Sequence, residues 1–316
     1  MTEARYIQSE IKKFNDFYFK EIQSNVELID KVLKYLCKQK GKLLRPKLSL
    51  FTAKILGGVN EKTYIAASLV EMIHVATLIH DDIVDESQLR RGWPTIGRVW
   101  KNKVSVLIGD YLFSKSLSTT AKLDDMKSIS ILSKTSDQLS KGEIFQIQQS
   151  RKKNMSKNDY YKMIEDKTAS LFSAACELSA RTVTSNDQSI ALFKDFGRNF
   201  GMAYQIKDDI DDIFGKEENL GKPSNFDLKK NMLTLPCIYC LESLGENDKI
   251  KFLTKIKTLS KKNKTKEIRI LVEKHKGLDY SNKALNKYLD KSKEAISRFS
   301  DSKELISFID RVFYEK

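Results

Sequence analysis

Residues 62–86 decide the fold, and they read KTYIAASLVEMIHVATLIHDDIVDE. Apolar residues recur there at the spacing of a helix, and further apolar residues widen the stripe almost around the circumference. This pattern predicts a buried central helix that ends in acidic residues. Residues 189–214 have the same design, because an apolar helical stretch leads into DDIDD at residues 208–212. The sequence therefore predicts two buried helices that both end in carboxylates.

The rest of the chain also has the periodicity of helices rather than the alternation of strands. Its four prolines, Pro46, Pro94, Pro223 and Pro236, lie in or beside polar motifs, where helices must stop. No internal repeat, low-complexity linker or Gly/Ser-rich boundary divides the sequence, so we predict a single all-α domain over residues 1–316. Further helices are predicted at residues 6–37, 103–121, 126–150, 157–182, 232–244 and in the region after 246.

The composition is that of a soluble globular protein, with 41% hydrophobic and 31% charged residues. A formal net charge of +14 would attract nucleic acid or an anionic membrane. The lysines are scattered through helical stretches, however, and the one dense cluster, at residues 261–266, has the features of a solvated loop. We therefore expect no nucleic-acid partner, and a positive field that helps to draw in diphosphates.

The cysteines favour a reducing compartment, because Cys37, Cys176, Cys237 and Cys240 lack the spacing of a disulfide framework. Cys237 and Cys240 lie in an apolar run without the second half of a zinc site, so we expect them to pack in the core. The first residues lack a targeting pattern, and no apolar run reaches membrane-spanning length without ionisable interruptions. These features predict a cytoplasmic protein with at most peripheral membrane contact.

Two aspartate clusters, DDIVD at residues 81–85 and DDIDD at residues 208–212, share the pattern D-D-x-x-D. One copy arises by chance in about one chain in twenty and then marks a solvated helix end, so the second copy makes the signal specific. Residues four apart lie on one face of a helix. Magnesium prefers oxygen ligands and commonly bridges carboxylates to phosphate. We expect the two clusters to face each other across a cleft. The predicted metal ligands are Asp81, Asp85, Asp208 and Asp212.

Cationic residues occur in four short, loop-like motifs: GKLLRP at 41–46, RRGWPT at 90–95, KT at 167–168 and GKP at 221–223. An arginine guanidinium binds phosphate oxygens in a bidentate manner, and a lysine supplies a point charge. Each motif alone is typical of a protein surface. Together with two metal-binding helices, the motifs indicate a site for two diphosphates.

In their order and combination these motifs resemble the trans-polyprenyl diphosphate synthase family. The resemblance covers nearly the whole chain and implies the isoprenoid synthase fold, a helical bundle around a central cavity, and a homodimer. Besides the four cationic motifs, the matching segments are HVATLIHDDIVDESQL at 74–89, GD at 109–110, GEIFQ at 142–146, GMAYQIKDDIDD at 201–212, DL at 227–228 and TLP at 234–236.

The resemblance also implies an activity, the joining of isopentenyl diphosphate to an allylic diphosphate, farnesyl or geranylgeranyl. Three magnesium ions would bridge Asp81, Asp85 and Asp208 to the allylic diphosphate and stabilise its departure. Asp82, Arg90 and Lys167 would also take part in catalysis. The residues implied for the isopentenyl diphosphate are Lys42, Arg45, His74 and Arg91, and those for the allylic diphosphate are Arg90, Lys167, Thr168, Gln205 and Lys222.

One position departs from the family pattern. Met232 stands where the family usually has a lysine, two residues before TLP. Three consequences stay open: Lys229 or Lys230 substitutes from the same loop, the protein is a slower enzyme, or it needs a partner chain. Both aspartate clusters are intact, which argues against an inactive protein.

The small residues Ala76 and Thr77 lie one turn before Asp81, where short-chain members of the family carry aromatic rings. The resemblance therefore favours a long product, hexa- to octaprenyl. Small residues here are also compatible with ordinary helix packing, and a plug deeper in the tunnel, such as Phe113, would give a geranylgeranyl diphosphate synthase. A partner or regulatory subunit of a heteromeric synthase is the alternative of another class. A class I terpene cyclase is disfavoured, because it handles one diphosphate and has no use for Lys42, Arg45 and His74.

Overall fold

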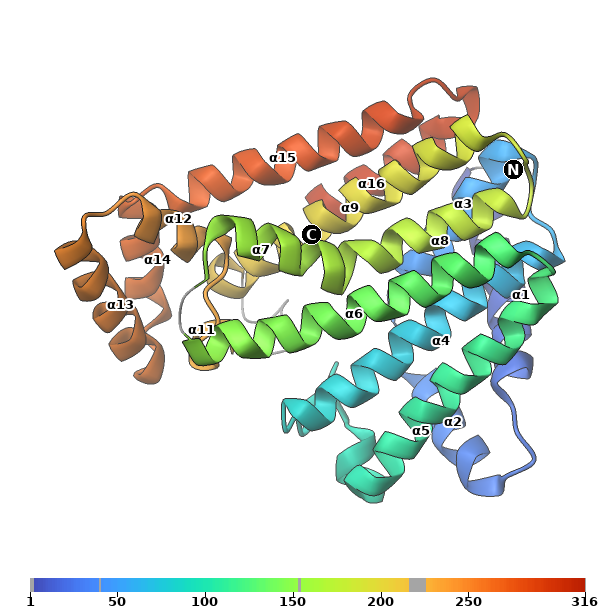
Figure 1. Ribbon diagram of the computed structural model, residues 1–316, viewed down its shortest axis with the longest axis horizontal. Helices are drawn as coiled ribbons and strands as arrows, with labels where there is room; N and C mark the ends of the chain where they lie inside the picture. The colour runs from blue at the N-terminus through green and yellow to red at the C-terminus, as the bar shows by residue number, and fades with distance from the viewer. Residues whose placement is uncertain (1–2, 40, 153–154, 216–225, 316) are drawn as a thin grey trace. The chain divides into compact units, whose positions relative to one another are not determined.

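The computed structural model describes residues 3–39, 41–152, 155–215 and 226–315, and helices make up most of this part of the chain. The all-α prediction is confirmed (Figure 1). Contacts between Cα atoms divide the chain into two compact units, and each unit is built from separate segments of sequence. The first comprises residues 1–136, 171–197 and 295–316, and the second comprises residues 137–170 and 198–294. A single domain over residues 1–316 stays a prediction.

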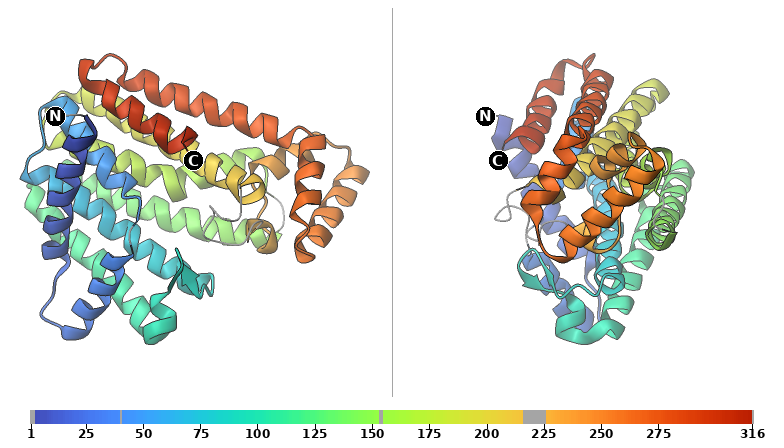
Figure 2. Two further views of the ribbon diagram at one scale, coloured as in Figure 1. Left: turned by 180° about the vertical axis from the view of Figure 1, so that it is seen from behind. Right: turned by 90° about the vertical axis from the view of Figure 1, so that its left-hand side faces the viewer.

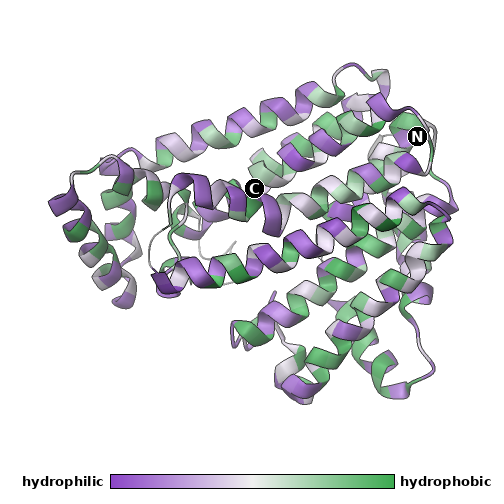
Figure 3. Cartoon of the chain, viewed as in Figure 1, coloured by the Kyte–Doolittle hydropathy of each residue, from purple (hydrophilic) through white to green (hydrophobic). Residues whose placement is uncertain are grey.

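Helix α4 (Glu61–Val84) is the central helix of the first unit, as predicted. It packs against α1 (Glu3–Ile22), α3 (Leu44–Leu56) and α5 (Ile96–Thr120), and Figure 2 shows α1 beside α3 and α4. Most of its side chains up to residue 76 are buried, and in Figure 3 hydrophobic colour predominates in its body. By length and composition α4 could cross a membrane, but 67% of its apolar window is buried inside the structure, as expected of a core helix.

Local sequence explains where α4 begins and ends. At its start Asn60 and Thr63 form a capping box, in which the Thr63 N–H donates to Asn60 Oδ1 at 3.0 Å and the Asn60 N–H donates to Thr63 Oγ1 at 3.3 Å. At its end the N–H of Asp85 still donates to the carbonyl of Asp81 at 2.8 Å, and Glu86 then takes a positive φ of 51°. The DDIVD motif therefore occupies the last turn of a buried helix.

The contact between α4 and α5 depends on Gly109. A Cβ atom at position 109 would collide with the imidazole ring of His80, so the ring can lie against α5 only where the side chain is absent. His80 Nε2 lies 3.4 Å from an oxygen of Asp110. Glycine at this position thus sets how closely the end of α4 approaches its neighbour.

The structure corrects the prediction of one helix at residues 6–37. Helix α1 ends at Ile22, and a separate α2 (Glu27–Lys38) follows a polar turn. In this turn the N–H of Ser24 donates to Asp30 Oδ1 at 3.0 Å. The hydroxyl of Tyr111 donates to the carbonyl of Ile22 at 3.0 Å and stabilises the end of α1. A tertiary contact, which periodicity cannot reveal, ends the helix here.

A short hairpin follows α4, and the sequence did not predict it. Strands β1 (Leu89–Arg90) and β2 (Trp93–Pro94) pair antiparallel around Arg91 and Gly92, whose φ angles are 52° and 79°. Two consecutive positive φ angles are typical of a tight hairpin turn, and glycine at the second position favours it. The hairpin places Arg90 and Arg91 beside the end of α4.

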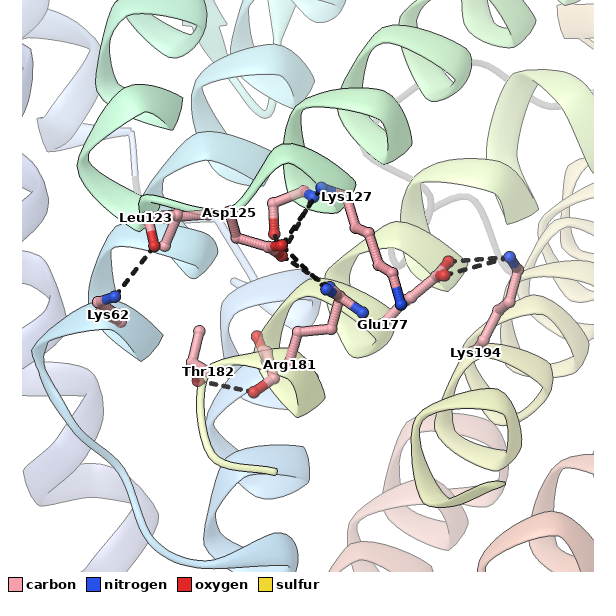
Figure 4. Close-up of polar contacts among 10 residues, drawn as sticks. Lys62, Leu123, Asp125, Lys127, Glu177, Arg181, Thr182 and Lys194 are labelled. Atoms are coloured by element: carbon pink, nitrogen blue, oxygen red, sulfur yellow. Dashed lines mark hydrogen bonds and ion pairs between the residues drawn. The ribbon is translucent and has the colours of Figure 1, made fainter. Parts of the chain in front are cut away.

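Ion pairs hold the other end of the first unit together (Figure 4). The Arg181 guanidinium at the end of α8 (Ser170–Arg181) donates to both oxygens of Asp125, at 2.8 and 3.0 Å. This partner holds the pKa of Asp125 well below its usual range. Lys62 near the start of α4 donates to the carbonyl of Leu123 at 3.0 Å. These contacts tie α4 and α8 to the turn between α5 and α6 (Met126–Lys152).

The remaining elements of the first unit are short. They are η1 (Ala121–Leu123), η3 (Ser300–Ser302) and α16 (Lys303–Tyr314).

The second unit contains the end of α9 (Asp187–Phe214), which carries the second aspartate cluster. The Arg269 guanidinium donates to the carbonyls of Ile213 and Gly215, at 2.7 and 2.6 Å, and so caps this helix end. Stretch 157–182, predicted as one helix, is α7 (Lys157–Ile164), a π-helical turn η2 (Glu165–Ala169) and α8. The other helices are α11 (Phe226–Lys229), α12 (Leu235–Glu242), α13 (Glu246–Lys261), α14 (Thr265–Lys274) and α15 (Gly277–Ile296).

Cys237 and Cys240 lie in the apolar core of the second unit, which confirms their predicted packing role. All four cysteines are free thiols. Burial raises the pKa of Cys240 to about 12 and that of Cys237 further still.

Candidate functional site

The first aspartate cluster is tied to the hairpin by an ion pair. Arg90 Nε lies 2.9 Å from each carboxylate oxygen of Asp82, and Nη2 lies 2.7 Å from Oδ1. The side chain of Asp82 is only 12% exposed, so a guanidinium offsets the cost of its partial burial. Asp81 is half-buried and Asp85 is exposed. The middle carboxylate therefore orients the hairpin, while the other two keep more access to solvent.

The residues predicted for isopentenyl diphosphate converge beside this cluster. The pKa of His74 lies well below its usual range because the ring is buried and because Arg45, Arg91 and Arg90 repel a proton on it. A Cβ atom at Gly41 would lie 2.5 Å from Arg91 Nη1, so the GKLLRP loop contacts the tip of the hairpin. The structure thus brings Arg45, His74 and Arg91 together around an uncharged imidazole.

Lys42 is exposed in the loop that leads into α3. The guanidinium of the neighbouring Arg45 stacks on the ring of Phe172, with its central carbon 4.2 Å from the ring centre. A stacked guanidinium keeps a defined orientation and still presents N–H groups at its edge. This arrangement suits an arginine that must meet a phosphate in a fixed place.

Glu71 is a member of this group that sequence reasoning missed. Its carboxyl is 8% exposed one turn before His74, and burial raises its pKa while Arg45 and Arg91 lower it. The only signal in the sequence was a single acidic residue inside an apolar run. The positive charges of Arg45 and Arg91 thus favour the ionised form of Glu71, against the larger effect of its burial.

The second aspartate cluster is built differently. The hydroxyl of Tyr160 donates to Asp209 Oδ2 at 2.6 Å, and the Gln205 amide donates to Oδ1 at 2.8 Å. Asp209 is 3% exposed, so burial raises its pKa well above the usual range, and the charge of Asp227 raises it further. The two hydrogen bonds act in the opposite direction. The middle carboxylate of this cluster is fixed by neutral donors.

The outer aspartates of the second cluster differ from each other. Asp208 is exposed, whereas Asp212 is 1% exposed. The carboxylate of Asp212 accepts the backbone N–H groups of Phe226 and Asp227, at 3.1 and 3.3 Å. Asp212 therefore anchors the start of α11, and its predicted role as a metal ligand stays a prediction.

The predicted allylic-diphosphate residues of the second unit form one network. Lys167 Nζ lies 2.5 Å from Glu143 Oε2 and 3.0 Å from Gln146 Oε1, both on α6. Thr168 Oγ1 donates to Gln205 Oε1 at 2.8 Å. The GEIFQ and KT motifs, some twenty residues apart in sequence, are thus brought together next to Gln205, which donates to Asp209.

This network depends on the π-helical turn. The turn contains Lys167 and Thr168, and π-helical turns occur frequently at functional sites. Gly142 makes room for it, because a Cβ atom there would lie 2.8 Å from the backbone nitrogen of Lys167. Sequence reasoning missed Tyr160 altogether, since a tyrosine in an amphipathic helix gives no signal of a role.

The loop around Met232 contains one lysine that folds back. Lys230 Nζ lies 4.4 Å from the centre of the Phe226 ring, whereas Lys229 is exposed. Ser150 donates to the Lys230 carbonyl at 2.9 Å and fixes its backbone. Of the two candidate substitutes for the missing lysine, Lys230 is the one held against α11. Lys222 lies outside the described residues.

The two predicted chain-length residues lie on α4. Ala76 is 1% exposed in a cluster of apolar side chains, and the Thr77 hydroxyl donates to the carbonyl of His74 at 2.8 Å. Their role in setting product length stays a prediction.

The donor set fits magnesium. Within the ranges that the structure describes, no group of three or more His, Cys, Asp or Glu side chains converges on one point. Each cluster nevertheless offers accessible carboxylates, Asp81 and Asp85 in one unit and Asp208 in the other. Magnesium is commonly bound by one or two carboxylates, with water and substrate phosphate oxygens completing its octahedron. Such a site takes the remaining ligands from a diphosphate.

The fold and these residues define a class: all-α proteins with aspartate-rich helix ends and cationic loops suited to metal-bound diphosphates. Within this class, the family model of polyprenyl synthetase matches residues 26–274. The chain belongs to the polyprenyl synthetase family, and the resemblance inferred from its motifs is confirmed.

Three similar proteins illustrate the family. An octaprenyl diphosphate synthase of Haemophilus influenzae is 30% identical over 287 residues, which cover 91% of this chain and 86% of the relative. Component 2 of a heptaprenyl diphosphate synthase from Geobacillus stearothermophilus is 36% identical over 220 residues, covering 70% and 69%. A crystal structure of a polyprenyl synthase from Caulobacter crescentus CB15, complexed with calcium and isoprenyl diphosphate, has a TM-score of 0.89 at 30% identity and covers 99% and 97%.

Proposed function

We propose that this prenyltransferase condenses isopentenyl diphosphate with farnesyl or geranylgeranyl diphosphate to an all-trans hexa- to octaprenyl diphosphate. The observation that carries the proposal is the presence of two D-D-x-x-D helix ends, each supported by its own polar contacts and accompanied by cationic motifs. The names of the octaprenyl and heptaprenyl relatives support a long product.

The residues of the first unit bind isopentenyl diphosphate in this proposal. Arg45 and Arg91 contact its diphosphate, Lys42 adds a charge from the loop, and the uncharged His74 contributes a hydrogen bond. The N–H groups of the guanidinium ions match phosphate oxygens in pairs. Arg90, held by Asp82, contacts the allylic diphosphate.

The residues of the second unit bind the allylic diphosphate. Lys167, Thr168, Gln205 and Lys222 contact it, and Lys230 supplies the charge that Met232 lacks. Magnesium held by Asp81, Asp85, Asp208 and Asp212 would neutralise the charge that develops on the departing diphosphate. The allylic carbon–oxygen bond then breaks, the double bond of isopentenyl diphosphate attacks the allylic carbon, and the released diphosphate takes up the proton lost from the product. Exclusion of water from the site would protect the carbocation from hydrolysis.

Product length rests on Ala76 and Thr77. A small side chain at either position leaves room for a growing chain, which supports the long product over geranylgeranyl diphosphate. Phe113, the candidate plug, is 36% exposed on α5. The proposed length of the product therefore depends on Ala76 and Thr77 and not on Phe113.

We also propose a homodimer in the cytoplasm. Helix α5, which is kinked at Lys101, exposes large apolar side chains on both sides of the kink, which a second copy would cover. The free thiols suit a reducing compartment. A heteromeric synthase is the alternative, supported by the name of the Geobacillus component. The exposed apolar residues of α5 are Val99, Val106, Leu107, Phe113 and Leu117.

One experiment tests this function. The purified protein is incubated with magnesium, labelled isopentenyl diphosphate and farnesyl diphosphate, and the products are separated by length after removal of the phosphates. The proposal predicts a ladder that ends at six to eight isoprene units. A stop at four units would establish geranylgeranyl diphosphate synthesis instead. No elongation from any allylic starter, by a folded protein, would contradict a self-sufficient enzyme and point to a partner chain.

A further inference from the structure

Helices α13 and α14 carry half of the net positive charge of the chain. Together with the turn that joins them they span residues 245–276, which we call the basic helix pair. This segment contains eleven Lys and Arg residues and four Asp and Glu residues, a net charge of +7 out of +14. The two helices lie side by side (Figure 1), and the chain turns between them at Asn263, whose φ is 53°.

The inner faces of the basic helix pair are packed, so its charge lies on the outside. Phe252 and Ile256 of α13 belong to the apolar core of the second unit, as do Ile268 and Val272 of α14. The guanidinium of Arg269, the single arginine of the pair, is engaged in capping α9. Eight of the ten lysines are exposed. The outer face is therefore a lysine surface with no part in holding the core together.

Acidic neighbours neutralise only part of this surface. Three lysines form ion pairs with acids three residues away, and exposed pairs of this kind are weak. Lys255, Lys261 and Lys262 form no ion pair with any acid in the ranges that the structure describes. The three pairs are Lys249–Glu246 at 2.6 Å, Lys251–Asp248 at 3.2 Å and Lys264–Glu267 at 3.1 Å.

Two large aliphatic side chains interrupt the charged surface. Ile250 is 65% exposed and Ile270 is 66% exposed. Ile250 lies seven residues before Lys257 on α13, and Ile270 lies four residues from both Lys266 and Lys274 on α14. Residues at these spacings share one face of a helix, so each isoleucine points outward among lysines. The outer face thus combines positive charge with apolar side chains that are open to a partner.

The composition of this face favours one kind of polyanion. Single-stranded nucleic acids are bound by basic grooves with aromatic side chains that stack on the bases. In the basic helix pair the aromatic Phe252 is buried, with its ring 5.6 Å from that of His275. An anionic lipid bilayer attracts lysine clusters to its headgroups and takes aliphatic side chains into the layer just below. The face is therefore complementary to an anionic membrane rather than to RNA.

We propose that the outer face of the basic helix pair binds reversibly to an anionic lipid bilayer. Its lysines lie at the lipid headgroups, and Ile250 and Ile270 enter the boundary of the acyl chains. Clusters of about four to eight basic residues are typical of such sites. The inference goes beyond the proposed function, and it adds a destination for the product. A long prenyl chain is apolar and partitions from water into lipid, so docking brings the enzyme to the phase that accepts what it makes.

Co-sedimentation of the purified protein with lipid vesicles tests the proposal. In about 0.1 M NaCl the protein should bind vesicles of phosphatidylcholine with phosphatidylglycerol at least tenfold more tightly than vesicles of phosphatidylcholine alone. Raising the salt to about 0.5 M should release it, because exposed charges are screened. Equal affinity for the two kinds of vesicle overturns the proposal, and so does a failure to bind either.

Two variants with the same net charge show which surface binds. Charge reversal at three lysines of the basic helix pair should weaken binding to the anionic vesicles at least tenfold. The same change at three exposed lysines of the first unit is the matched control and should leave binding nearly unchanged. Equal weakening in the two variants, both with wild-type melting temperatures, would show a general attraction and overturns the proposal. The test variant is Lys255→Glu/Lys261→Glu/Lys262→Glu, and the control is Lys12→Glu/Lys34→Glu/Lys134→Glu.

The isoleucines separate a membrane from a soluble polyanion. Ile250→Ser/Ile270→Ser should weaken binding to anionic vesicles at least fivefold, because less apolar surface enters the lipid. Binding to heparin, which has no apolar phase, should stay unchanged. If this variant binds vesicles as the wild type does, and a short single-stranded RNA displaces both proteins from them, the face is a site for nucleic acid and the proposal is overturned.

Vesicle binding needs no turnover, so the two proposals can fail separately. If the protein elongates no allylic starter but binds anionic vesicles through the basic helix pair, the proposed function fails and the membrane site stands. If elongation proceeds but the protein binds no vesicle, the membrane site fails and the proposed function stands.

Discussion

The two aspartate clusters have the same motif but use it differently. The middle aspartate of the first cluster, Asp82, is partly exposed and held by the charge of Arg90. The middle aspartate of the second, Asp209, is buried and held by the neutral side chains of Tyr160 and Gln205. An ion pair at a surface can exchange partners with a substrate, whereas a buried hydrogen-bonded carboxyl stays in place. A repeated motif therefore predicts that two sites bind the same type of ligand. It does not predict that the same types of residue hold the motif in place.

The last aspartates extend this contrast. Asp85 is exposed just beyond the end of its helix, whereas Asp212 holds the start of α11 through two backbone N–H groups. The first cluster thus presents its outer aspartate to solvent, and the second uses its outer aspartate to organise the loop that follows. Substitutions at equivalent positions should have different effects on activity and stability.

The largest effect is expected at Asp85. Asp85→Ala should lower kcat about a thousandfold, the scale expected when a group that stabilises transition-state charge is removed. The melting temperature should stay unchanged, because the side chain is exposed. Asp212→Ala should lower both kcat and the melting temperature, because the N–H groups of Phe226 and Asp227 lose their acceptor. Steady-state kinetics and calorimetry check both variants. Equal loss of stability in the two variants would refute the contrast.

The supports of the two middle aspartates should differ in their contribution to stability. Tyr160→Phe removes a hydrogen bond from a buried carboxyl and should cost about 1–3 kcal/mol of unfolding free energy. Arg90→Gln breaks a partly exposed ion pair and should cost no more than about 1 kcal/mol. Urea unfolding at neutral pH measures both costs. The contrast fails if Arg90→Gln is the more destabilising variant.

Near the first cluster, the stability of the fold should also depend on pH through His74. The pKa of His74 is lowered, so the unfolded chain binds a proton below about pH 6.5 that the folded chain refuses. The stability that depends on His74 is therefore present above pH 6.5 and is lost as pH falls. His74→Gln should remove this loss, worth about 1.4 kcal/mol per pH unit below pH 6.5. Urea unfolding at pH 7.5 and 5.5 compares the two proteins, and identical pH dependence would contradict the prediction.

The smallest effect is expected at Asp211, the aspartate that the second cluster has in place of Val84. Its carboxylate pairs with Lys207 at 2.9 Å, one turn earlier on α9. Pairs of this kind contribute about 0.3–0.5 kcal/mol. Asp211→Asn should therefore leave kcat nearly unchanged and shift the unfolding free energy by less than about 0.5 kcal/mol. A large loss of activity would show that the second cluster uses this extra aspartate in catalysis.

The sequence allowed prediction of the features that local periodicity encodes. The two buried helices, their acidic ends and the packing of Cys237 and Cys240 follow from residues close together in the chain. The hairpin that carries Arg90 and Arg91 depends on two positive φ angles at a polar dipeptide, which several turn types accommodate. Periodicity could not separate it from an ordinary loop.

The missed residues depend on long-range contacts. Tyr160 gains its role from Asp209, 49 positions away in the sequence. The π-helical turn that presents Lys167 needs the missing side chain of Gly142 on another helix. Neither pattern exists before the chain is folded, so only the structure could reveal how the second cluster is supported.

The contact between His80 and Gly109 has a consequence for the evolution of this chain. Because a larger residue at position 109 would strike the imidazole ring where it now lies, the two positions should change together. An alanine at 109 requires the partly exposed His80 ring to turn away from α5 and to give up its position beside Asp110. Among descendants of this protein, alanine at 109 should therefore occur more often where position 80 carries a smaller side chain.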